Sequence, residues 1–315
     1  MSTPHRELPR LVDVVLVPLA NLTVAFLVSG LVVLAIGENP LEAVKIMIQG
    51  ALGYPEGIGF TLYYATGFVF TGLSVAVAFH AGLFNIGSEG QATLGGLGVA
   101  LVCLTFDGAP WWLVAPFALA ASALFGAAWA YVPAWLQARR GSHIVITTIM
   151  FNYLAATLMV WLLVEVLGQP GSMSPETKTF EPATRLPFLR EFLAPFGVDL
   201  GQSPLNPMVF VALLAAVFVW VLVWRTRFGF ELRTVGQNPV AAVYAGIDPG
   251  GVVIVAMLIS GGLAGLMAVN EVMGVQHRLL LEFTAGAGFV GIAVALMGRS
   301  HPFGVVLASL LFGIL

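Results

Sequence analysis

One polar segment decides how this chain folds: Arg225-Thr-Arg-Phe-Gly-Phe-Glu-Leu-Arg-Thr-Val-Gly-Gln-Asn-Pro-Val-Ala-Ala-Val-Tyr-Ala-Gly-Ile-Asp-Pro249. Its three arginines outnumber its two acids, and the runs on either side, residues 205–224 and 251–270, contain no charged side chain. About 20 apolar residues in a helix cross the hydrocarbon core of a bilayer. The segment is therefore predicted to be a loop between two membrane-spanning helices.

The composition of the whole chain agrees with a membrane protein. Of its 315 residues, 59% are hydrophobic and 9% are charged, whereas about 25% of residues are charged in a soluble domain. The apolar runs are continuous and do not alternate with polar residues, which favours helices over a β-barrel. The net charge is −3, and no basic patch is concentrated anywhere, which argues against a nucleic-acid partner.

The hydropathy pattern predicts an all-α, polytopic membrane protein with about nine spans, in which residues 1–315 form a single transmembrane domain. We expect a short surface helix at 41–50. The last run, 303–315, would reach only about 20 Å as a helix, so we expect the native chain to continue beyond Leu315. The expected spans cover residues 14–36, 59–79, 91–106, 111–136, 144–164, 207–224, 252–270 and 286–298, with a ninth from Phe303.

Short loops rich in Lys and Arg predict the orientation, because such loops stay in the cytoplasm. A cytoplasmic N-terminus with Arg6 and Arg10 places Arg139-Arg140, the 225–249 loop and Arg299 on the same side. Eight of the thirteen Lys and Arg residues then lie inside. Residues 165–206 become a long outer segment, and most loops of this length in compact proteins are lids, caps or docking surfaces.

Glu89 is the most informative ionisable residue, since it lies in the glycine-rich stretch Ala81–Gln91 between two apolar runs. A carboxylate at membrane depth costs about 2.5–3.5 kcal/mol and normally faces a cavity or a partner. Alternatively the stretch lies at the cytoplasmic surface, where Glu89 is solvated and caps a helix. Neutral polar residues in or beside the spans could bond a substrate or hold helices together; they are Asn85, Gln91, Asn152 and Asn270.

Familiar catalytic motifs are missing or have a simpler explanation. The sequence Gly286-Ala-Gly-Phe-Val-Gly291 matches a dinucleotide-binding pattern, but its apolar flanks indicate helix packing by small residues. No phosphate-binding P-loop, zinc-protease motif or serine nucleophile elbow occurs. We therefore expect no enzyme activity in this chain, no cofactor and no metal. The one cysteine, Cys103, excludes an internal disulfide and reads as a core residue.

Several separated motifs from about residue 60 to the end resemble the permease subunits of bacterial ABC importers of the branched-chain amino acid, simple sugar and nucleoside group. The nucleoside branch is the most similar. One departure is Ser142-His143, where nucleoside permeases commonly carry an Asn-Glu pair. The motifs that carry the resemblance are Phe84-Asn-Ile-Gly-Ser-Glu-Gly-Gln91, Thr147-Thr-Ile-Met-Phe-Asn-Tyr153, Leu232-Arg-Thr-Val-Gly-Gln-Asn-Pro-Val-Ala-Ala-Val-Tyr-Ala-Gly-Ile247 and Gly288-Phe-Val-Gly-Ile-Ala-Val-Ala-Leu-Met-Gly-Arg299.

The resemblance implies a subunit in the bacterial inner membrane that takes up a nucleoside, with ATP hydrolysed by a separate cytoplasmic ATPase. A second permease subunit, an extracytoplasmic substrate-binding protein and membrane lipid are the other implied partners. It also implies broken helices along the pathway, with Asn85, Glu89, Gln91, Asn152, Asn270 and Phe289 as candidate lining residues. The 225–249 loop would dock the ATPase through a short helix that starts at Asn238-Pro239. The candidate docking residues are Arg233, Gly236, Asn238, Pro239, Ala241, Ala242 and Gly246.

Two alternatives stay open. The same kind of transporter could carry a simple sugar such as ribose. A lone ion-coupled secondary transporter is the alternative from another class, although such a carrier has no need for a docking helix in the 225–249 loop.

Overall fold

The computed structural model describes residues 16–169, 171, 173–197 and 199–315. The chain forms two compact units, Met1–Tyr54 and Pro55–Leu315, and each is described by itself. Arg6 and Arg10, on which the predicted orientation partly rests, lie outside the described residues, and so does the start of the expected span at 14–36.

The first unit holds two helices, α1 (Val17–Ala35) and α2 (Pro40–Leu52). The α2 helix begins at Pro40 because the Asn39 side chain accepts a hydrogen bond from the Leu41 amide at 3.0 Å, as an N-cap does. The helices bend by 108° at the break between them. The short helix expected at 41–50 is confirmed as α2.

The second unit consists of helices joined by loops, and its described residues contain one isolated antiparallel bridge, between Glu176 and Leu280. Its α-helices are α3 (Pro55–His80), α4 (Ser88–Thr105), α5 (Trp111–Arg140), α6 (Ile144–Trp161), α7 (Leu189–Leu193), α8 (Met208–Arg225), α9 (Arg227–Gln237), α10 (Pro239–Tyr244), α11 (Pro249–Ala268), α12 (Ala287–Met297) and α13 (Pro302–Ile314). Two π-helical stretches, η2 (Leu162–Val166) and η5 (Val269–Gln276), extend α6 and α11, and two single 3-10 turns are η3 (Pro182–Thr184) and η4 (Ala194–Phe196).

The expected fold class is confirmed, because the chain is an all-α, multi-pass membrane protein. In the described residues, five helical stretches are long and apolar enough to cross a membrane, or six if the bent pair in the first unit is one span. The expected count of nine is not confirmed. A full crossing at 286–298 is not confirmed, because α12 has 11 residues and rises only about 16 Å against a core of about 30 Å.

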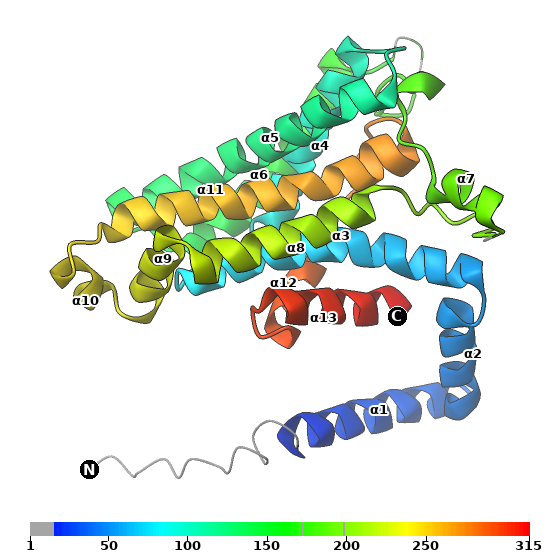
Figure 1. Ribbon diagram of the computed structural model, residues 1–315, viewed down its shortest axis with the longest axis horizontal. Helices are drawn as coiled ribbons and strands as arrows, with labels where there is room; N and C mark the ends of the chain where they lie inside the picture. The colour runs from blue at the N-terminus through cyan, green and yellow to red at the C-terminus, as the bar shows by residue number, and fades with distance from the viewer. Residues whose placement is uncertain (1–15, 170, 172, 198) are drawn as a thin grey trace. The chain divides into compact units, whose positions relative to one another are not determined.

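The core of the second unit rests on close helix crossings made by glycine. The α5 and α11 helices lie side by side (Figure 1), and a side chain at Gly126, Gly261 or Gly265 would overlap the backbone of the opposite helix. Small residues allow this approach where no apolar driving force exists between helices in lipid. Cys103 is fully buried in this core.

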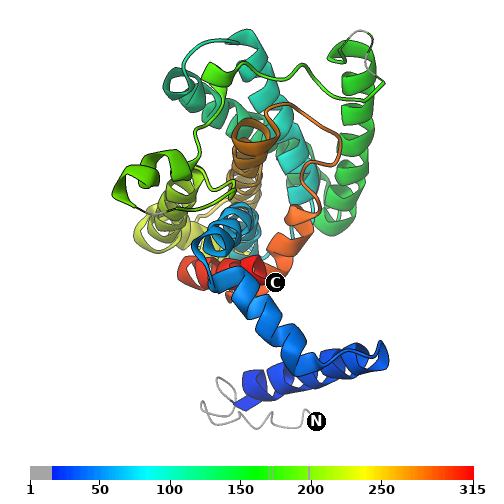
Figure 2. The ribbon, with the colours of Figure 1, turned by 90° about the vertical axis from the view of Figure 1, so that its right-hand side faces the viewer.

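The α12 and α13 helices pack together on α3, and Figure 2 looks along the long helices of this unit. Gly72 of α3 lies against Val294 of α12 and Val305 of α13, and no larger residue would fit at Gly72. Gly291 of α12 lies directly against Thr71. The glycine pattern at 286–291 thus serves helix packing.

Candidate functional site

The chain between α3 and α4 turns back into the bundle. Gly82 adopts a φ of 73° that ends α3, and the Ser88 hydroxyl at the start of α4 then lies 3.1 Å from that of Ser74. Ser74 precedes His80, the last residue of α3, by six residues, which is about 9 Å of helix. The start of α4 is therefore inside the bundle, and the alternative that places Glu89 at the surface loses support.

The segment between α3 and α4, residues 81–87, is called the break from here on. Asn85 lies at the centre of a buried hydrogen-bond network in this break. Its amide nitrogen donates to Gln91 Oε1 at 2.9 Å and to Ser260 Oγ at 2.8 Å. Its amide oxygen accepts from the Gly87 amide at 2.8 Å and from Gln91 Nε2 at 3.2 Å. Asn85 and Gln91 are completely enclosed. The network holds the break to α11 in this conformation, and a pathway role for the two amides stays a prediction.

The Glu89 carboxylate joins the start of α4 to the start of α12. Its Oε1 atom accepts from the Thr284 hydroxyl at 2.5 Å and from the Gly286 amide at 3.0 Å, and Oε2 accepts from the Gly288 amide at 2.7 Å. A side chain at Gly288 would overlap the Glu89 backbone. Two helix N-termini thus converge on one carboxylate, whose negative charge complements the partial positive charge of both.

The loop between η5 and α12 reaches Glu89 by running along α4. The Phe283 ring fills the space at Gly96, so that no side chain fits there. Three non-glycine residues of this loop have positive φ angles, namely His277 at 56°, Glu282 at 55° and Ala285 at 47°. Each such residue costs about 1–2 kcal/mol, and strained backbone of this kind concentrates at sites that move or bind.

The remaining candidate pathway residues fall into two groups. Asn152 of α6 accepts from the Gly90 amide and donates to the Ile86 carbonyl, both at 2.9 Å, so it also fastens the break. Asn270 is buried and accepts from Asn206 Nδ2 at 3.0 Å. Phe289, in contrast, is 49% exposed beside the start of α12. Among these residues Phe289 is the most exposed, and it follows Gly288, whose amide donates to the Glu89 carboxylate.

The 225–249 segment forms α9 and α10, and the short helix expected at Asn238-Pro239 is confirmed. Asn238 caps α10 by accepting from the Ala241 amide at 3.0 Å, and Pro239 is its first residue. Gly246, with a φ of 77°, ends the turn that follows. Ala242 is fully buried. These residues shape a tight turn that projects a short helix.

Gly236 and Arg233 lie on α9, where it meets the end of α3. A side chain at Gly236 would overlap the His80 carbonyl, so α9 is seated directly on the residue where the break begins. Arg233 Nε donates to the Gly229 carbonyl at 3.2 Å. A movement of α9 would therefore reach the break through backbone contact.

Sequence reasoning missed the most exposed apolar and aromatic residues of this segment. Tyr244 is 89% exposed, and Val240 and Val243 are exposed on the same short helix. Apolar and aromatic side chains in an otherwise polar loop of a membrane protein were the available signal, because a solvated loop gains nothing from them.

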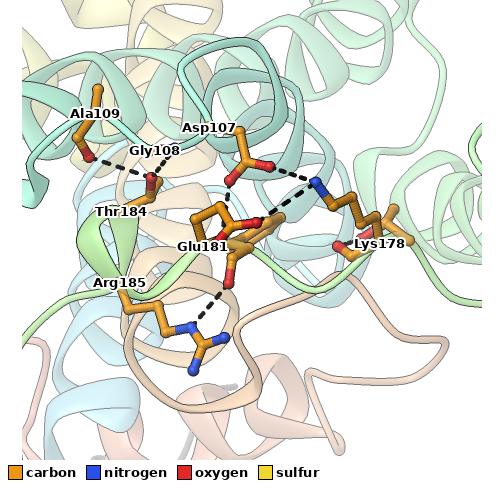
Figure 3. Close-up of polar contacts among 9 residues, drawn as sticks. Asp107, Gly108, Ala109, Lys178, Glu181, Thr184 and Arg185 are labelled. Carbon is orange, nitrogen blue, oxygen red and sulfur yellow. Dashed lines mark hydrogen bonds and ion pairs between the residues drawn. The ribbon is translucent and has the colours of Figure 1, made fainter.

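The 165–206 segment is fastened to the turn between α4 and α5, as Figure 3 shows. Asp107 accepts from Lys178 Nζ at 2.9 Å and from the Glu181 amide at 2.8 Å. The Gly108 amide donates to the Thr184 hydroxyl at 3.0 Å. Burial by itself would raise the pKa of Asp107, but the Glu181 amide and the Lys178 ammonium together lower it below its ordinary value.

The same segment also holds the loop that leads to Glu89. Arg278 Nη1 lies 3.1 Å from Glu176 Oε1, and the Phe180 amide donates to the His277 carbonyl at 2.8 Å. The segment therefore bridges the α4–α5 turn and the strained loop, as a cap would.

We predict that Asp107→Asn loosens this cap. Asparagine keeps the size but loses the charge that binds Lys178, and an exposed pair of this kind contributes up to about 1 kcal/mol. Trypsin should cleave after Lys178 several-fold faster, while Glu181→Gln, which removes only a contact of 3.8 Å, leaves the rate unchanged. Equal cleavage of the wild type and Asp107→Asn would contradict the attachment.

The attachment should also weaken in acid. Because the folded-state pKa of Asp107 lies below its ordinary value, its stabilising effect is present above that ordinary value of about 3.9 and is lost as the pH falls through the folded-state pKa. A dye at Met173→Cys, in a Cys103→Ala background, should lose anisotropy only in that acid range. A loss that began near neutral pH would show that another group controls the cap.

No group of three or more His, Cys, Asp or Glu side chains in the described part of the chain could hold a metal ion. The site instead consists of a break, two converging half-helices, one carboxylate and a projecting turn on α9 and α10.

Comparison with known proteins places this geometry in context. The family model described as "branched-chain amino acid transport system / permease component" matches residues 57–315. A guanosine ABC transporter permease protein of Bacillus subtilis is 37% identical over 300 residues, which cover 95% of this chain and 83% of the relative.

A nucleoside ABC transporter permease protein of Lactococcus lactis is 34% identical over 96% of this chain and 82% of its own length. A glucose ABC transporter permease protein of Haloferax volcanii is 32% identical over 95% of this chain and 78% of its own length. No solved structure matches the chain.

Proposed function

The chain belongs to the family of branched-chain amino acid transport system permease components, and from this premise we propose that it is the permease subunit of an ATP-driven ABC importer that carries nucleosides into the cell. The relatives that are 37% and 34% identical are guanosine and nucleoside permeases. Their similarity extends over nearly the whole chain, so it includes both the break and the 225–249 segment.

The Glu89 carboxylate is the observation that favours an uncharged solute. In transporters with broken helices, half-helix N-termini bind anionic groups such as the carboxylate of an amino acid. Here the Gly286 and Gly288 amides at the start of α12 already bind a carboxylate of the chain itself, that of Glu89. A further anion beside Glu89 would be repelled, whereas a nucleoside carries no charge at neutral pH. This argument favours nucleosides over the amino acids in the family description.

A simple sugar is the second candidate. It is also uncharged, and the glucose permease of Haloferax volcanii supports it at 32% identity. The argument from Glu89 does not separate sugars from nucleosides, so the preference rests on the higher identity to nucleoside permeases. Phe289, which is exposed and follows Gly288 at the start of α12, offers a surface on which a base could stack.

The proposed orientation places α9 and α10 in the cytoplasm of a bacterium and the 165–206 cap outside its inner membrane. A separate ATPase then docks on α10, and a substrate-binding protein delivers the solute at the cap. A second permease subunit completes the pathway. The exposed Val240, Val243 and Tyr244 support ATP-driven coupling over an ion-coupled secondary carrier, which needs no such docking surface.

Competition for uptake tests this proposal. Cells without other nucleoside uptake would express the complete transporter and be given radiolabelled guanosine. Excess adenosine should reduce the accumulation of label, and excess glucose or leucine should not. If glucose is accumulated and guanosine is not, the sugar alternative replaces the nucleoside. If an ionophore stops uptake while cellular ATP is unchanged, the ion-coupled secondary carrier replaces the ATP-driven importer as the function.

A further inference from the structure

A cavity of about 280 Å³ opens at the end of the bundle where α3, α8 and α9 meet. Its walls combine two aromatic rings with groups that bind anions. The residues come from α3 and from the consecutive helices α8 and α9, which lie far from α3 in sequence, so the cavity exists only in the folded chain. It is lined by Phe79, His80, Trp224, Arg233, Gly236 and Gln237.

Arg233 supplies a positive charge that no acid of the described chain neutralises. Only its Nε atom is bonded, to the Gly229 carbonyl, and it forms no ion pair in the described residues. The acids of the same segment are already occupied, since Glu231 pairs with Arg227 at 2.9 Å and Asp248 caps α11. The two terminal nitrogens of Arg233 remain free to bind an anion as a fork.

Two further arginines are next in sequence to Trp224, which lines the cavity, and to Ser300, which contacts His80. Arg225 follows Trp224, and its guanidinium lies 5.1 Å from the centre of the Trp220 ring. Arg299 precedes Ser300, whose carbonyl lies 3.0 Å from His80 Nε2. Neither arginine forms an ion pair among the described residues. Arg233 is thus the cation that lines the cavity itself.

The position of the cavity indicates the kind of anion. It lies at the end of the apolar α8 helix, where Trp224 makes an edge-on contact with His80 at 5.1 Å and lies 5.0 Å from the His301 ring. Tryptophan and arginine at the end of a spanning helix mark the level of lipid headgroups. Val217, Phe218 and Val221 are exposed on the preceding turns of α8, which gives an apolar surface that leads to the cavity.

We propose that this cavity binds the headgroup phosphate of an anionic phospholipid, with Arg233 as the principal ligand and the acyl chains along α8. The proposal requires only that the chain spans a membrane, and it does not depend on the transported solute. Because Gly236 seats α9 on the His80 carbonyl, a bound lipid would stabilise the contact through which α9 reaches the break. In this proposal Arg233 contacts lipid, and the docking of the ATPase falls to α10.

Native mass spectrometry of the purified full-length chain in detergent tests the site with phosphatidylglycerol as the probe. Arg233→Gln should weaken phosphatidylglycerol binding by at least about tenfold, since a charge-assisted bond is roughly twice as strong as a neutral one. Arg227→Gln on the same helix is the matched control and should bind as the wild type does, because Arg227 is exposed and pairs only with Glu231. Arg233→Lys should retain part of the affinity.

Three outcomes would overturn the proposal. Phosphatidylcholine could bind as tightly as phosphatidylglycerol, or Arg233→Gln could bind like the wild type. Inorganic phosphate at millimolar concentration could displace the lipid, in which case the site binds free anions. Repeating the titration with the ATPase subunits present should leave the lipid bound, and its release would assign the cavity to a carboxylate of that partner.

Discussion

Replacing Glu89 with alanine should abolish transport while the chain still inserts into the membrane. The carboxylate accepts hydrogen bonds from Thr284, Gly286 and Gly288 at 2.5–3.0 Å, and each bond to a charged group contributes about 1.5–3 kcal/mol. Without it, three donors inside the bundle lose their partner, and the start of α12 is released from α4. We expect uptake to fall by more than about tenfold, since 1.4 kcal/mol already corresponds to that factor.

The substitutions at Glu89 should follow a definite order. Glu89→Gln keeps an oxygen for Thr284 and Gly286 but turns an amide nitrogen toward the Gly288 N–H, so its uptake should be intermediate. Glu89→Lys places a cation between two helix N-termini and should be the most severe change. Glu282→Gln changes an exposed acid of the same loop and is the control. Normal uptake by Glu89→Lys at normal membrane levels would show that this carboxylate does not hold the pathway together.

A negative charge introduced on the exposed surface of α10 should uncouple ATP hydrolysis from the presence of the solute. Val243→Asp and Tyr244→Asp remove the exposed apolar surface on which we propose the ATPase docks, and central anchors of an interface contribute about 2 kcal/mol or more. Solute-stimulated ATP hydrolysis by the assembled complex should fall by more than about tenfold, while the amount of permease in the membrane is unchanged.

Gly246→Trp tests the same turn in another way. A side chain at Gly246 meets nothing within 4 Å, but its φ of 77° is strained for any other residue, so we expect uncoupling without a clash in the core. Tyr131 is an exposed aromatic residue of α5, and Tyr131→Ala is the control. A complex assembled with this variant should show the same solute-stimulated ATP hydrolysis as the wild type. Full stimulation in both Val243→Asp and Gly246→Trp would place the ATPase elsewhere on the chain.

The sequence predicted the parts of this fold that depend on hydropathy alone. In the part of the chain that the structure describes, each of the nine expected apolar runs contains a helix, and the α10 start at Asn238-Pro239 follows from local capping. The half-length of α12 could not be predicted, because hydropathy measures how apolar a run is and does not show where the preceding loop ends. The residue at which α12 starts is fixed by a tertiary contact, the hydrogen bond that the Gly288 amide donates to the Glu89 carboxylate.

The candidate site shows the same limit. Glu89 stood out because a carboxylate between apolar runs needs a partner, but the partner lies 195 residues away at Thr284 and no spacing rule connects the two. The polarity of Asn85 and Gln91 singles them out in the same way, yet they bond to each other, and Asn85 also bonds to Ser260 in the core. Polarity in a span finds residues that need partners, and only the fold shows whether the partner is the protein or a solute.

Reconstitution of the complete transporter in proteoliposomes tests the central claim most directly. The permease, its ATPase, the second permease subunit and the binding protein would be combined, with ATP on the side of α9 and α10 and radiolabelled guanosine with its binding protein on the other. We predict accumulation of guanosine that requires ATP hydrolysis and is lost with Glu89→Lys. Accumulation that continues without ATP and follows an imposed ion gradient would contradict the account.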